Sequence, residues 1–551
     1  MTSANPPARA PARPAVLQPY RRSPDAPGRR RARGLAIALL AFFSFFWGMV
    51  FAFLAPALIL VLLAPALILL MVTIWALPDL RTAPTRALER LFFLYVVVAI
   101  LWPSYISIAI PNSGLPWVNP QRLIYAPMAL IFLICLAVSR DFRTRLSTAL
   151  QSEKPILWLM IAFMIIMTYS VPLSDRIFVS MDKWVDALVT WACMFFIACY
   201  LFSQPGRVVR WAATIWVCAV ISGVIGLWEW RLHHVPWLGY LPAFLQMDPE
   251  MAKEITPSFR QAVYRVRSTY QDGLGLGEFM SLAMPFVLCF ALGPFSRKIR
   301  IAAMVTVPFL IGLVFLANAR SGVVGLMVDF GLYGFYWGFM RWRRHKDSLI
   351  GPALMLSYPA LAGLVVLSSL FVDAIRIRLF GGGATQSSND ARKVQWAMGV
   401  PKVLSHPFGH GIGRAGEALG YYSPGGLLTI DTYYLSVLLD YGIIGFVVYY
   451  GLILYSSYAT GRLALTNDSD DHDTQFLAAA SISLAAFFVI KSVYSQPNNH
   501  ALFFMVMGMA PALVWRLRTL QATAKAEAAQ TAKPGGAPRR PRNPAHQPAR
   551  A

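Results

Sequence analysis

Long apolar stretches alternate with short polar segments along nearly the whole chain between Leu35 and Leu517. A helix needs about 20 mainly apolar residues to cross the hydrocarbon layer of a bilayer, and this pattern supplies enough of them for an all-α polytopic membrane protein with about 14 transmembrane helices. The expected spans lie near residues 35–55, 57–77, 91–110, 123–138, 156–172, 184–202, 208–228, 276–293, 299–317, 320–340, 350–372, 433–457, 475–494 and 500–516.

Lys and Arg collect in every second connection between these spans. Lys and Arg collect in cytoplasmic loops of membrane proteins, so a cytoplasmic N-terminus places the clusters around Arg81, Arg140, Arg207, Arg297 and Arg341 inside. An even number of spans then returns the basic C-terminus to the cytoplasm. The connections 229–275 and 373–432 fall on the periplasmic side, and the second is expected to contain a short amphipathic helix.

Composition agrees with a membrane protein and places most of the charge at the ends. The chain is 57% hydrophobic and 14% charged, with a net charge of +23. Both tails are rich in Ala, Pro and Arg, which is a disordered composition, so the charge indicates contact with anionic lipid rather than nucleic acid. The expected divisions are a disordered basic tail (1–34), an N-terminal transmembrane bundle (35–228), a core with both long loops (229–457), C-terminal transmembrane helices (458–517) and a second disordered basic tail (518–551).

Several arginines lie on the side where the topology rule disfavours them. Arg320 begins an apolar span within the segment Ala317–Gly322, where a cation must face protein, water or an anion. Arg suits phosphate because its planar fork offers two charge-assisted hydrogen bonds. A ring of such groups would fit a lipid pyrophosphate; the alternative is a set of solvated loop charges. The periplasmic loops contribute Arg260, Arg265, Arg267, Arg376, Arg378, Arg392 and Arg414.

The second long loop contains the expected short helix. Asn389 or Asp390 would cap it, and Arg392 would lie beside Trp396 one turn later, where one could bind phosphate and the other could stack on a sugar ring. An interfacial helix with an aromatic anchor is the alternative. The expected apolar face comprises Val394, Ala397, Met398 and Pro401.

A glycine-dense turn and an acidic segment complete this loop. His406 and His410 flank the turn, but the intervening Pro and Gly disfavour a helical metal pair, and we expect no metal and no cofactor. Asp431 then precedes the tyrosine pair Tyr433 and Tyr434 at the edge of a span. A carboxylate there can orient or deprotonate a sugar hydroxyl; the alternative is a helix N-cap.

These residues together resemble the O-antigen ligase and polymerase superfamily of bacterial surface-polysaccharide enzymes. The similarity covers roughly residues 260 to 450, and its motifs stand in the family's order. They are Arg267-Ser268-Thr269-Tyr270 with Gly277 and Pro285, Ala319-Arg320-Ser321-Gly322, Arg392 with Trp396, His406-Pro407-Phe408-Gly409 with Gly411 and Gly413, and Asp431-Thr432-Tyr433-Tyr434-Leu435 with Gly442 and Gly445.

The resemblance implies a metal-independent glycosyltransferase of the bacterial inner membrane. Such an enzyme moves a glycan from an undecaprenyl pyrophosphate carrier to a glycan or lipid acceptor on the periplasmic face. The family's pyrophosphate-binding arginines correspond to Arg267, Arg320 and Arg392. Ligases of the family usually carry a His-Asn pair where this chain has Asp431-Thr432, which favours polymerisation of repeat units over ligation. Asp431 and Arg320 are the expected catalytic residues.

The other expected contacts with pyrophosphate and glycan come from Arg265, Arg267, Arg392, Trp396, Arg414, Tyr433 and Tyr434. The expected partners are an undecaprenyl-pyrophosphate-linked oligosaccharide, its acceptor, membrane lipids, and a chain-length regulator or other polysaccharide assembly proteins. A polysaccharide transporter or lipid-linked glycan flippase is the alternative function, because it also needs a cationic cavity. Transporters tend to show inverted repeats, and the two halves of this chain show no convincing similarity.

Overall fold

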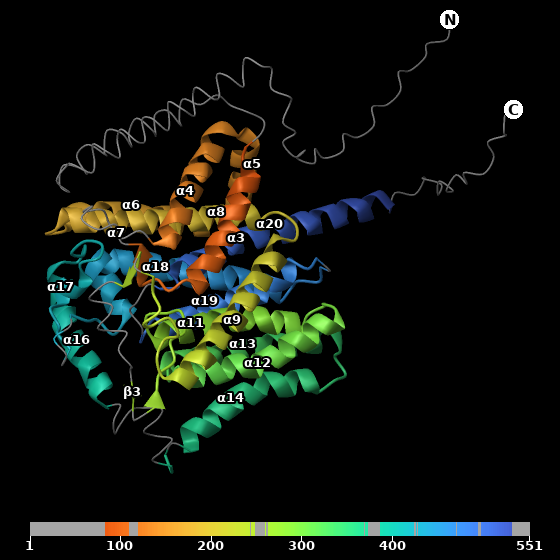
Figure 1. Cartoon of the computed structure of the whole chain (residues 1–551). Coiled ribbons are helices and arrows are strands. Elements are labelled where there is room, and N and C mark those ends of the chain that lie inside the picture. Colours follow the sequence, from red (N-terminus) through yellow and green to blue (C-terminus); the bar gives the residue numbers. More distant parts are fainter. Residues whose placement is uncertain are drawn as a thin grey trace, which may run out of the picture.

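The computed structural model describes residues 83–108, 119–242, 244–247, 259–260, 263–368, 370–372, 386–423, 426, 428–469, 471–493 and 498–531. The expected spans 35–55 and 57–77, the tail 1–34, and residues 248–258 and 373–385 of the two long loops lie outside these residues. Within them the chain is almost entirely helical, and most helices lie side by side along one direction (Figure 1).

Most helices follow one another with short connections, apart from the two long loops, which follow Leu232 and Ser368. They are α3 (Thr85–Leu101), α4 (Pro120–Val138), α5 (Arg140–Gln151), α6 (Lys154–Ser170), α7 (Ile177–Ala187), α8 (Met194–Phe202), α9 (Arg207–Leu232), α11 (Gly273–Leu292), α12 (Arg297–Leu316), α13 (Arg320–Arg344), α14 (Ile350–Ser368), α16 (Gln386–Ser405), α17 (Ala415–Leu419), α18 (Tyr433–Ala464), α19 (Leu477–Ile490) and α20 (His500–Thr531). Three short turns of other helix types are η1 (Val171–Leu173), η2 (Leu188–Cys193, a π-helix) and η4 (Thr474–Phe476).

Two small antiparallel sheets lie in the connections. β1 (Ile106–Ile108) pairs with β2 (Leu245–Met247), and β3 (Phe259–Arg260) pairs with β4 (Val263–Tyr264). The first sheet joins the segment after α3 to the long loop after α9. That loop is therefore anchored to the segment after α3 at Leu245–Met247.

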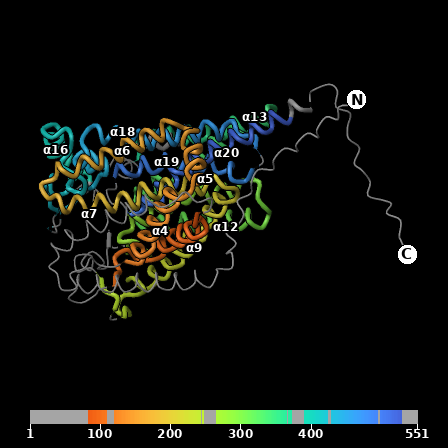
Figure 2. The backbone as a smooth tube through the Cα atoms, turned by 90° about the horizontal axis from the view of Figure 1, so that it is seen from above, coloured from red at the N-terminus to blue at the C-terminus, as the bar shows by residue number. Residues whose placement is uncertain are grey.

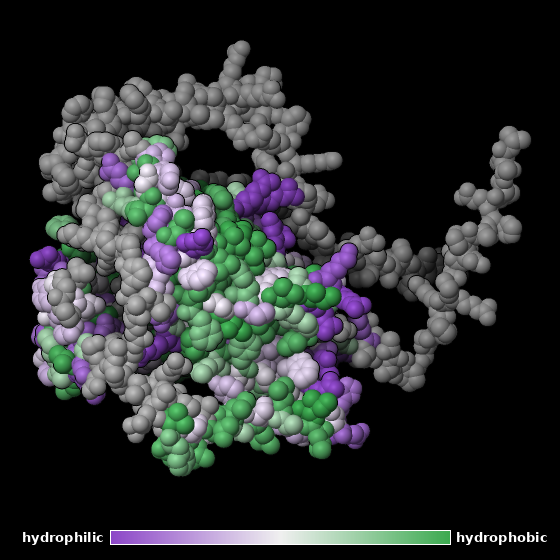
Figure 3. Space-filling view, turned by 60° about the horizontal axis from the view of Figure 1, so that its bottom comes forward, coloured by the Kyte–Doolittle hydropathy of each residue, from purple (hydrophilic) through white to green (hydrophobic). Residues whose placement is uncertain are grey.

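The chain is a multi-pass membrane protein. Among the described residues, nine helices are long and apolar enough to cross a bilayer, and Ile350–Leu361 and Thr474–Ile490 are shorter apolar stretches. Every expected span from 91–110 onward overlaps a helix, while the full count of about 14 stays a prediction. Figure 3 shows a broad apolar surface over the bundle, as the lipid-facing side of such a protein requires.

Two expected boundaries are wrong. The span expected at 91–110 is the earlier helix α3, which ends at Leu101 because Trp102-Pro103 follows and proline cannot continue a helix. Residues Ile106–Ile108 of the expected span form β1 instead. The tail expected to be disordered from residue 518 begins as helix, because α20 continues to Thr531 through an alanine-rich segment of high helix propensity.

Helix α11 is the centre of the bundle. Nearly all of its side chains are buried, and it packs against α9, α12, α13 and α19. Its crossing with α13 is close because a Cβ at Gly322 would lie only 2.9 Å from the Cα of Gly277. One turn further along, the Ser281 hydroxyl donates a hydrogen bond of 2.7 Å to Asp329. The first long loop leads directly into α11, so this central helix positions the end of the loop.

The basic connections gather at one end of the bundle. Arg145 donates to the Ser203 hydroxyl at 3.2 Å, and the backbone N–H of Val209 donates to Asp473 at 3.0 Å. Arg516, in the middle of α20, also contacts Asp473, at 3.1 Å. The basic connections thus lie at one end of the bundle, and the two long loops lie at the other. Which end faces the cytoplasm stays a prediction.

Candidate active site

Both long loops lie at the end of the bundle opposite the basic connections. The backbone N–H of Val266, in the first loop, donates to the carbonyl of Leu316 at the end of α12 at 3.2 Å. After the second loop, the backbone N–H of Tyr433 donates to the carbonyl of Lys491 at 3.1 Å. Helix α16 of the second loop lies at this same end in both ribbon views (Figure 1, Figure 2).

Arg267 is held at the base of the first loop by Glu229, near the end of α9. The Glu229 carboxylate accepts hydrogen bonds from the Tyr264 hydroxyl at 2.8 Å and from the backbone N–H groups of Arg267 and Ser268 at 3.1 and 2.6 Å. The Arg267 guanidinium donates to the carbonyl of Gln271 at 3.2 Å and is almost completely buried. Arg267 is therefore a fixed cation, not a solvated loop charge.

Arg320 begins α13 next to the segment that carries Arg267. A Cβ at Gly273, the first residue of α11, would lie only 2.6 Å from the carbonyl oxygen of Ala317, so the chain just before Arg320 contacts the chain just after Arg267. Arg320 and Arg265 are both half-buried. Three of the predicted arginines thus come from two adjoining segments at one end of the bundle.

Helix α16 differs from the expected short helix at its start. It is already helical at Gln386 and continues to Ser405, so the expected cap at Asn389 or Asp390 is wrong. The side-chain oxygen of Asn389 instead accepts a hydrogen bond of 3.3 Å from Arg392 inside the helix.

The buried face of α16 also differs from the expected one. Val394, Ala397 and Pro401 are exposed, whereas Gln395, Gly399 and Val403 are buried and Met398 packs beside them. A Cβ at Gly399 would lie 2.6 Å from Leu435, so the glycine lets α16 approach α18 closely. An apolar pattern could not show this face, because a glutamine and a glycine occupy its centre.

Arg392 and Asp431 come together through this packing. The backbone N–H of Asp431 donates to the side-chain oxygen of Gln395 at 2.9 Å, and the charge of Arg392 acts on the Asp431 carboxylate. Partial burial raises the pKa of Asp431 above its usual value, and it outweighs the lowering by Arg392 and Gln395. The N-cap of α18 is Thr432, so the cap alternative for Asp431 does not describe this structure.

The predicted aromatic contacts have different surroundings. Trp396 is half-buried against the cluster of Leu435, Leu439 and their neighbours. The ring of Tyr433 is buried, with its centroid 4.8 Å from that of His500, and the Tyr434 hydroxyl donates to the carbonyl of Phe488 at 2.8 Å. Both tyrosines therefore pack within the bundle in this structure.

The glycine-dense turn fills a break in α18. Helix α18 is interrupted at Gly442, whose φ of 71° is outside the helical range. The backbone N–H groups of His410 and Gly411 donate to the carbonyls of Leu439 and Asp440 at 2.7 and 3.1 Å. These bonds satisfy carbonyls that the break leaves without helical partners, as a buried backbone requires. The turn thus has a structural role beside the candidate site.

Arg414 is already engaged by carboxylates. Its guanidinium forms a bidentate pair with Asp175 at 2.8 and 3.0 Å and also contacts Glu417. Its backbone N–H and that of Ala415 donate to the Asp440 carboxylate at 2.9 and 2.7 Å. The Arg414 guanidinium lowers the pKa of the exposed Asp175 carboxyl. These contacts make Arg414 a cross-link between the glycine-dense turn and the segment after α6.

His406 and His410 lie close together, with ring centroids 4.6 Å apart. Burial lowers the pKa of His410 below its usual value. Across the part of the chain that the structure describes, no group of three or more His, Cys, Asp or Glu side chains could hold a metal ion.

A buried polar cluster beneath Asp431 was missed by the sequence reasoning. Lys491 pairs with Glu278 on α11 at 2.7 Å, and Asn499 donates to the same carboxylate at 2.9 Å. An ionisable residue within or at the edge of an apolar span marks a functional candidate, and Glu278 and Lys491 both carried that signal. Their pairing, however, is set by the tertiary fold.

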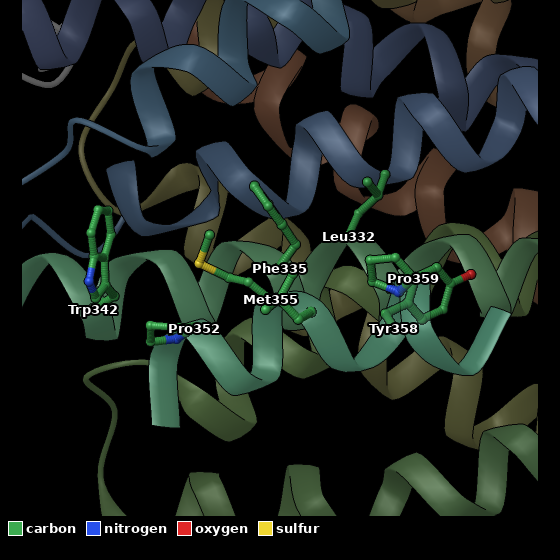
Figure 4. Close-up of a pocket in the computed structure, with 9 residues that line it drawn as sticks. Leu332, Phe335, Trp342, Pro352, Met355, Tyr358 and Pro359 are labelled. Atoms are coloured by element: carbon green, nitrogen blue, oxygen red, sulfur yellow. The ribbon is translucent and has the colours of Figure 1, made fainter. Parts of the chain in front are cut away.

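A separate groove of about 550 Å³ lies between α13 and α14, away from the predicted residues. Leu332, Phe335 and Trp342 of α13 face Met355 and Tyr358 of α14 across it (Figure 4). Its lining is apolar and several of these side chains are exposed. Such a groove suits hydrocarbon and offers no polar group to a sugar.

Comparison with known protein families finds a match that covers part of the candidate site. The family model described as O-antigen ligase matches residues 304–450, which confirms the predicted resemblance to the O-antigen ligase and polymerase superfamily. The matched segment contains Arg320, Arg392, Arg414 and Asp431, while Arg267 precedes it. No curated protein matches the chain.

Proposed function

We propose that the chain, whose residues 304–450 match the O-antigen ligase family of membrane enzymes, is a metal-independent glycosyltransferase acting on the periplasmic face of the inner membrane. Its donor would be an undecaprenyl-pyrophosphate-linked glycan, used in O-antigen or exopolysaccharide synthesis. The observation that carries this proposal is the placement of Asp431 beside Arg392, at the end of the bundle where Arg320 and Arg267 lie.

The reaction joins an acceptor hydroxyl to the anomeric carbon of the donor glycan. The hydroxyl oxygen forms the new bond to that carbon, and the bond from the carbon to the pyrophosphate oxygen breaks. The hydroxyl proton passes to Asp431, and undecaprenyl pyrophosphate leaves with the bonding electron pair. No oxidant, reductant or further reactant is needed.

The arginines would stabilise the departing pyrophosphate. Negative charge develops on its bridging oxygen as the bond breaks, so fixed cations stabilise the transition state more than the ground state. Arg267 is held by Glu229 and Gln271 within the fold itself, which limits reorganisation during the reaction. Arg320 and Arg392 complete the proposed anion site.

Asp431 is the proposed base. A carboxylate with an ordinary pKa is a weak base, and the partial burial that raises its pKa brings it closer to the value that proton transfer needs. Asp431 stands where ligases of the family usually carry histidine, and this supports polymerisation of repeat units over ligation to a lipid core.

The test replaces Arg320 by alanine in a strain that lacks the chromosomal copy. Arg320→Ala should abolish polymer on a gel while the protein still inserts, and lipid-linked single repeats should accumulate on the outer leaflet. Arg297→Ala is the matched control, because Arg297 also begins a helix but at the opposite end of the bundle. An unchanged chain-length distribution in Arg320→Ala refutes the proposal, and accumulation of repeats on the inner leaflet would instead indicate a flippase.

A further inference from the structure

An ion pair is completely enclosed in the bundle below the proposed site. The Lys491 ammonium lies 2.7 Å from one oxygen of Glu278, and the two side chains are 0% and 1% exposed. Asn499 donates to the other Glu278 oxygen at 2.9 Å and to the carbonyl of Gly275 at 3.1 Å. We call Glu278, Lys491 and Asn499 the buried triad.

The buried triad joins three parts of the chain. Glu278 lies in the second turn of α11, Lys491 follows α19, and Asn499 precedes α20. The carbonyl of Lys491 also accepts the backbone N–H of Tyr433 at the start of α18. Four helix ends are therefore linked through the Glu278 carboxylate and through the ammonium group and backbone carbonyl of Lys491.

These helix ends adjoin the residues that are proposed to act on the acceptor and on the pyrophosphate. Asp431, the proposed base, is two residues before Tyr433. On the other side, a Cβ at Gly277 would lie 3.0 Å from the Cβ of Ala319, the residue before Arg320. The triad thus lies on a path of contacts that runs from the segment of the proposed base to Arg320.

Charged and aromatic groups surround the pair on its other sides. Asp272, the N-cap of α11, acts electrostatically on both Glu278 and Lys491. The rings of Tyr433 and Phe487 flank the Lys491 ammonium at 5.2 and 4.9 Å. This enclosure leaves no room for bulk water.

An enclosed ion pair is an inefficient way to stabilise a fold. Desolvation of the two charges offsets much of their attraction, and an apolar pair of similar volume is often as stable. Hydrogen-bonded charges do, however, impose a fixed geometry on the elements that carry them. An ionisable residue inside a membrane protein is accordingly a functional candidate whose partner should be named.

We infer that Glu278, Lys491 and Asn499 are positioning residues, which set the separation between Asp431 on the α18 side and Arg320 on the α13 side. This inference rests on the proposed function. The triad does not touch substrate. Its loss should therefore reduce turnover far more than binding, because a displacement of about 1 Å from the reactive geometry can cost on the order of 100-fold in rate.

The test compares turnover with binding in the double variant Glu278→Gln/Lys491→Met, which removes both charges together and so leaves no lone buried charge. Turnover is measured as polymer formed per molecule of protein in a deletion strain. Binding is measured on the full-length protein in nanodiscs with undecaprenyl pyrophosphate as the probe. We expect normal protein amounts, affinity within about 3-fold of the unmodified protein, and turnover reduced about 10-fold or more.

A matched control removes ion pairs at the opposite end of the bundle. Arg516 pairs with both Asp471 and Asp473, and all three side chains are mostly buried. Arg516→Met/Asp471→Asn/Asp473→Asn therefore removes these charges together and should leave turnover per molecule unchanged. Equal turnover in the triad double variant and the unmodified protein overturns the inference, as does a loss of turnover fully explained by weaker binding.

Asn499→Ala tests the inference if the double-variant protein does not accumulate in the membrane. It removes one hydrogen bond to Glu278 without changing any charge, and we expect about a 3-fold to 10-fold loss of turnover at unchanged affinity. Wild-type turnover in Asn499→Ala would overturn the inference. Arg320→Ala separates the two proposals: if it retains polymer, the proposed function fails; if it abolishes polymer while the triad variants remain fully active, only the positioning role fails.

Discussion

The carboxylate of Asp440 accepts the backbone N–H of Arg414 at 2.9 Å, although the two residues belong to different elements. The same oxygen accepts the N–H of Ala415 at 2.7 Å. Asp440 therefore acts as an N-terminal cap for α17 supplied by another helix, and it holds the glycine-dense turn against the break in α18.

Asp440→Ala should destabilise the protein strongly. It leaves two buried N–H groups without an acceptor, and each costs about 1–3 kcal/mol. Asp440→Asn keeps one acceptor oxygen and should lose less. Thermal unfolding of the detergent-solubilised protein, followed by size-exclusion chromatography with fluorescence detection, measures both. Equal melting temperatures for Asp440→Ala and the unmodified protein would contradict the capping role.

Gly442→Ala should be destabilising because of its backbone. The φ of 71° and ψ of −171° at Gly442 are available essentially to glycine alone, and a strained residue of this kind costs on the order of 1–3 kcal/mol. A Cβ there would also overlap the carbonyl of Pro407.

Gly451→Ala is the control in the same helix. A Cβ at Gly451 meets only Leu159, at 3.9 Å, and alanine is favoured over glycine in a helix by up to about 1 kcal/mol. Protein amounts in the membrane and the melting temperature should fall for Gly442→Ala and hold or rise for Gly451→Ala. A similar response of both variants would show that the break at Gly442 is not required.

The activity should rise with pH through the pKa of Asp431. The carboxylate must be ionised to accept the hydroxyl proton, and burial raises its pKa. Arg392 lowers that pKa, so Arg392→Gln should raise it further and move the acidic limb of the pH–rate profile to higher pH. Lys393→Gln, an exposed neighbour paired with Asp390, should leave the limb in place. The profile is measured in proteoliposomes; an acidic limb that Arg392→Gln does not move excludes Asp431 as its origin.

The same pKa shift predicts an opposite effect on stability. The folded protein holds the Asp431 proton to higher pH than the unfolded chain, whose carboxyl titrates near 3.8. Stability from this residue is therefore fully present below that pH and is lost as pH rises through the raised pKa. Asp431→Asn should raise the melting temperature at pH 7 while abolishing polymer. The measurement is the difference in melting temperature between Asp431→Asn and the unmodified protein at pH 4 and at pH 7. A smaller gain at pH 7 than at pH 4 would contradict this prediction.

The sequence predicted those features that depend on local pattern. The length of each apolar stretch correctly predicted a helix at every expected span that the structure describes. Such a stretch must be buried in protein or face lipid, whatever its neighbours are. Arginines such as Arg320 could be selected as candidates because they lie where the rule that Lys and Arg collect in cytoplasmic loops does not expect them. The order of the motifs allowed the superfamily to be predicted before any geometry was known.

Features that depend on pairing between distant segments could not be predicted. The contact face of α16 is centred on Gln395 and Gly399, which no hydropathy pattern would select. Glu278 and Lys491 stand in different spans, and only the packing of α11 against α19 brings their charges together. Arg414 resembled a phosphate ligand in sequence because its partner Asp175 lies far away along the chain.

The orientation of the bundle in the membrane can be tested by cysteine labelling. Lys393→Cys would place an exposed thiol at the end of the two long loops, and Lys298→Cys would place one at the basic end. The five native cysteines give little background, because four are buried and Cys193 is only partly accessible within a span. A membrane-impermeant maleimide should label Lys393→Cys in intact spheroplasts and Lys298→Cys only after permeabilisation, since basic loops stay in the cytoplasm. The reverse pattern would place Arg320 and Asp431 in the cytoplasm, where a periplasmic donor could not reach them, and the proposed function would fall with the orientation.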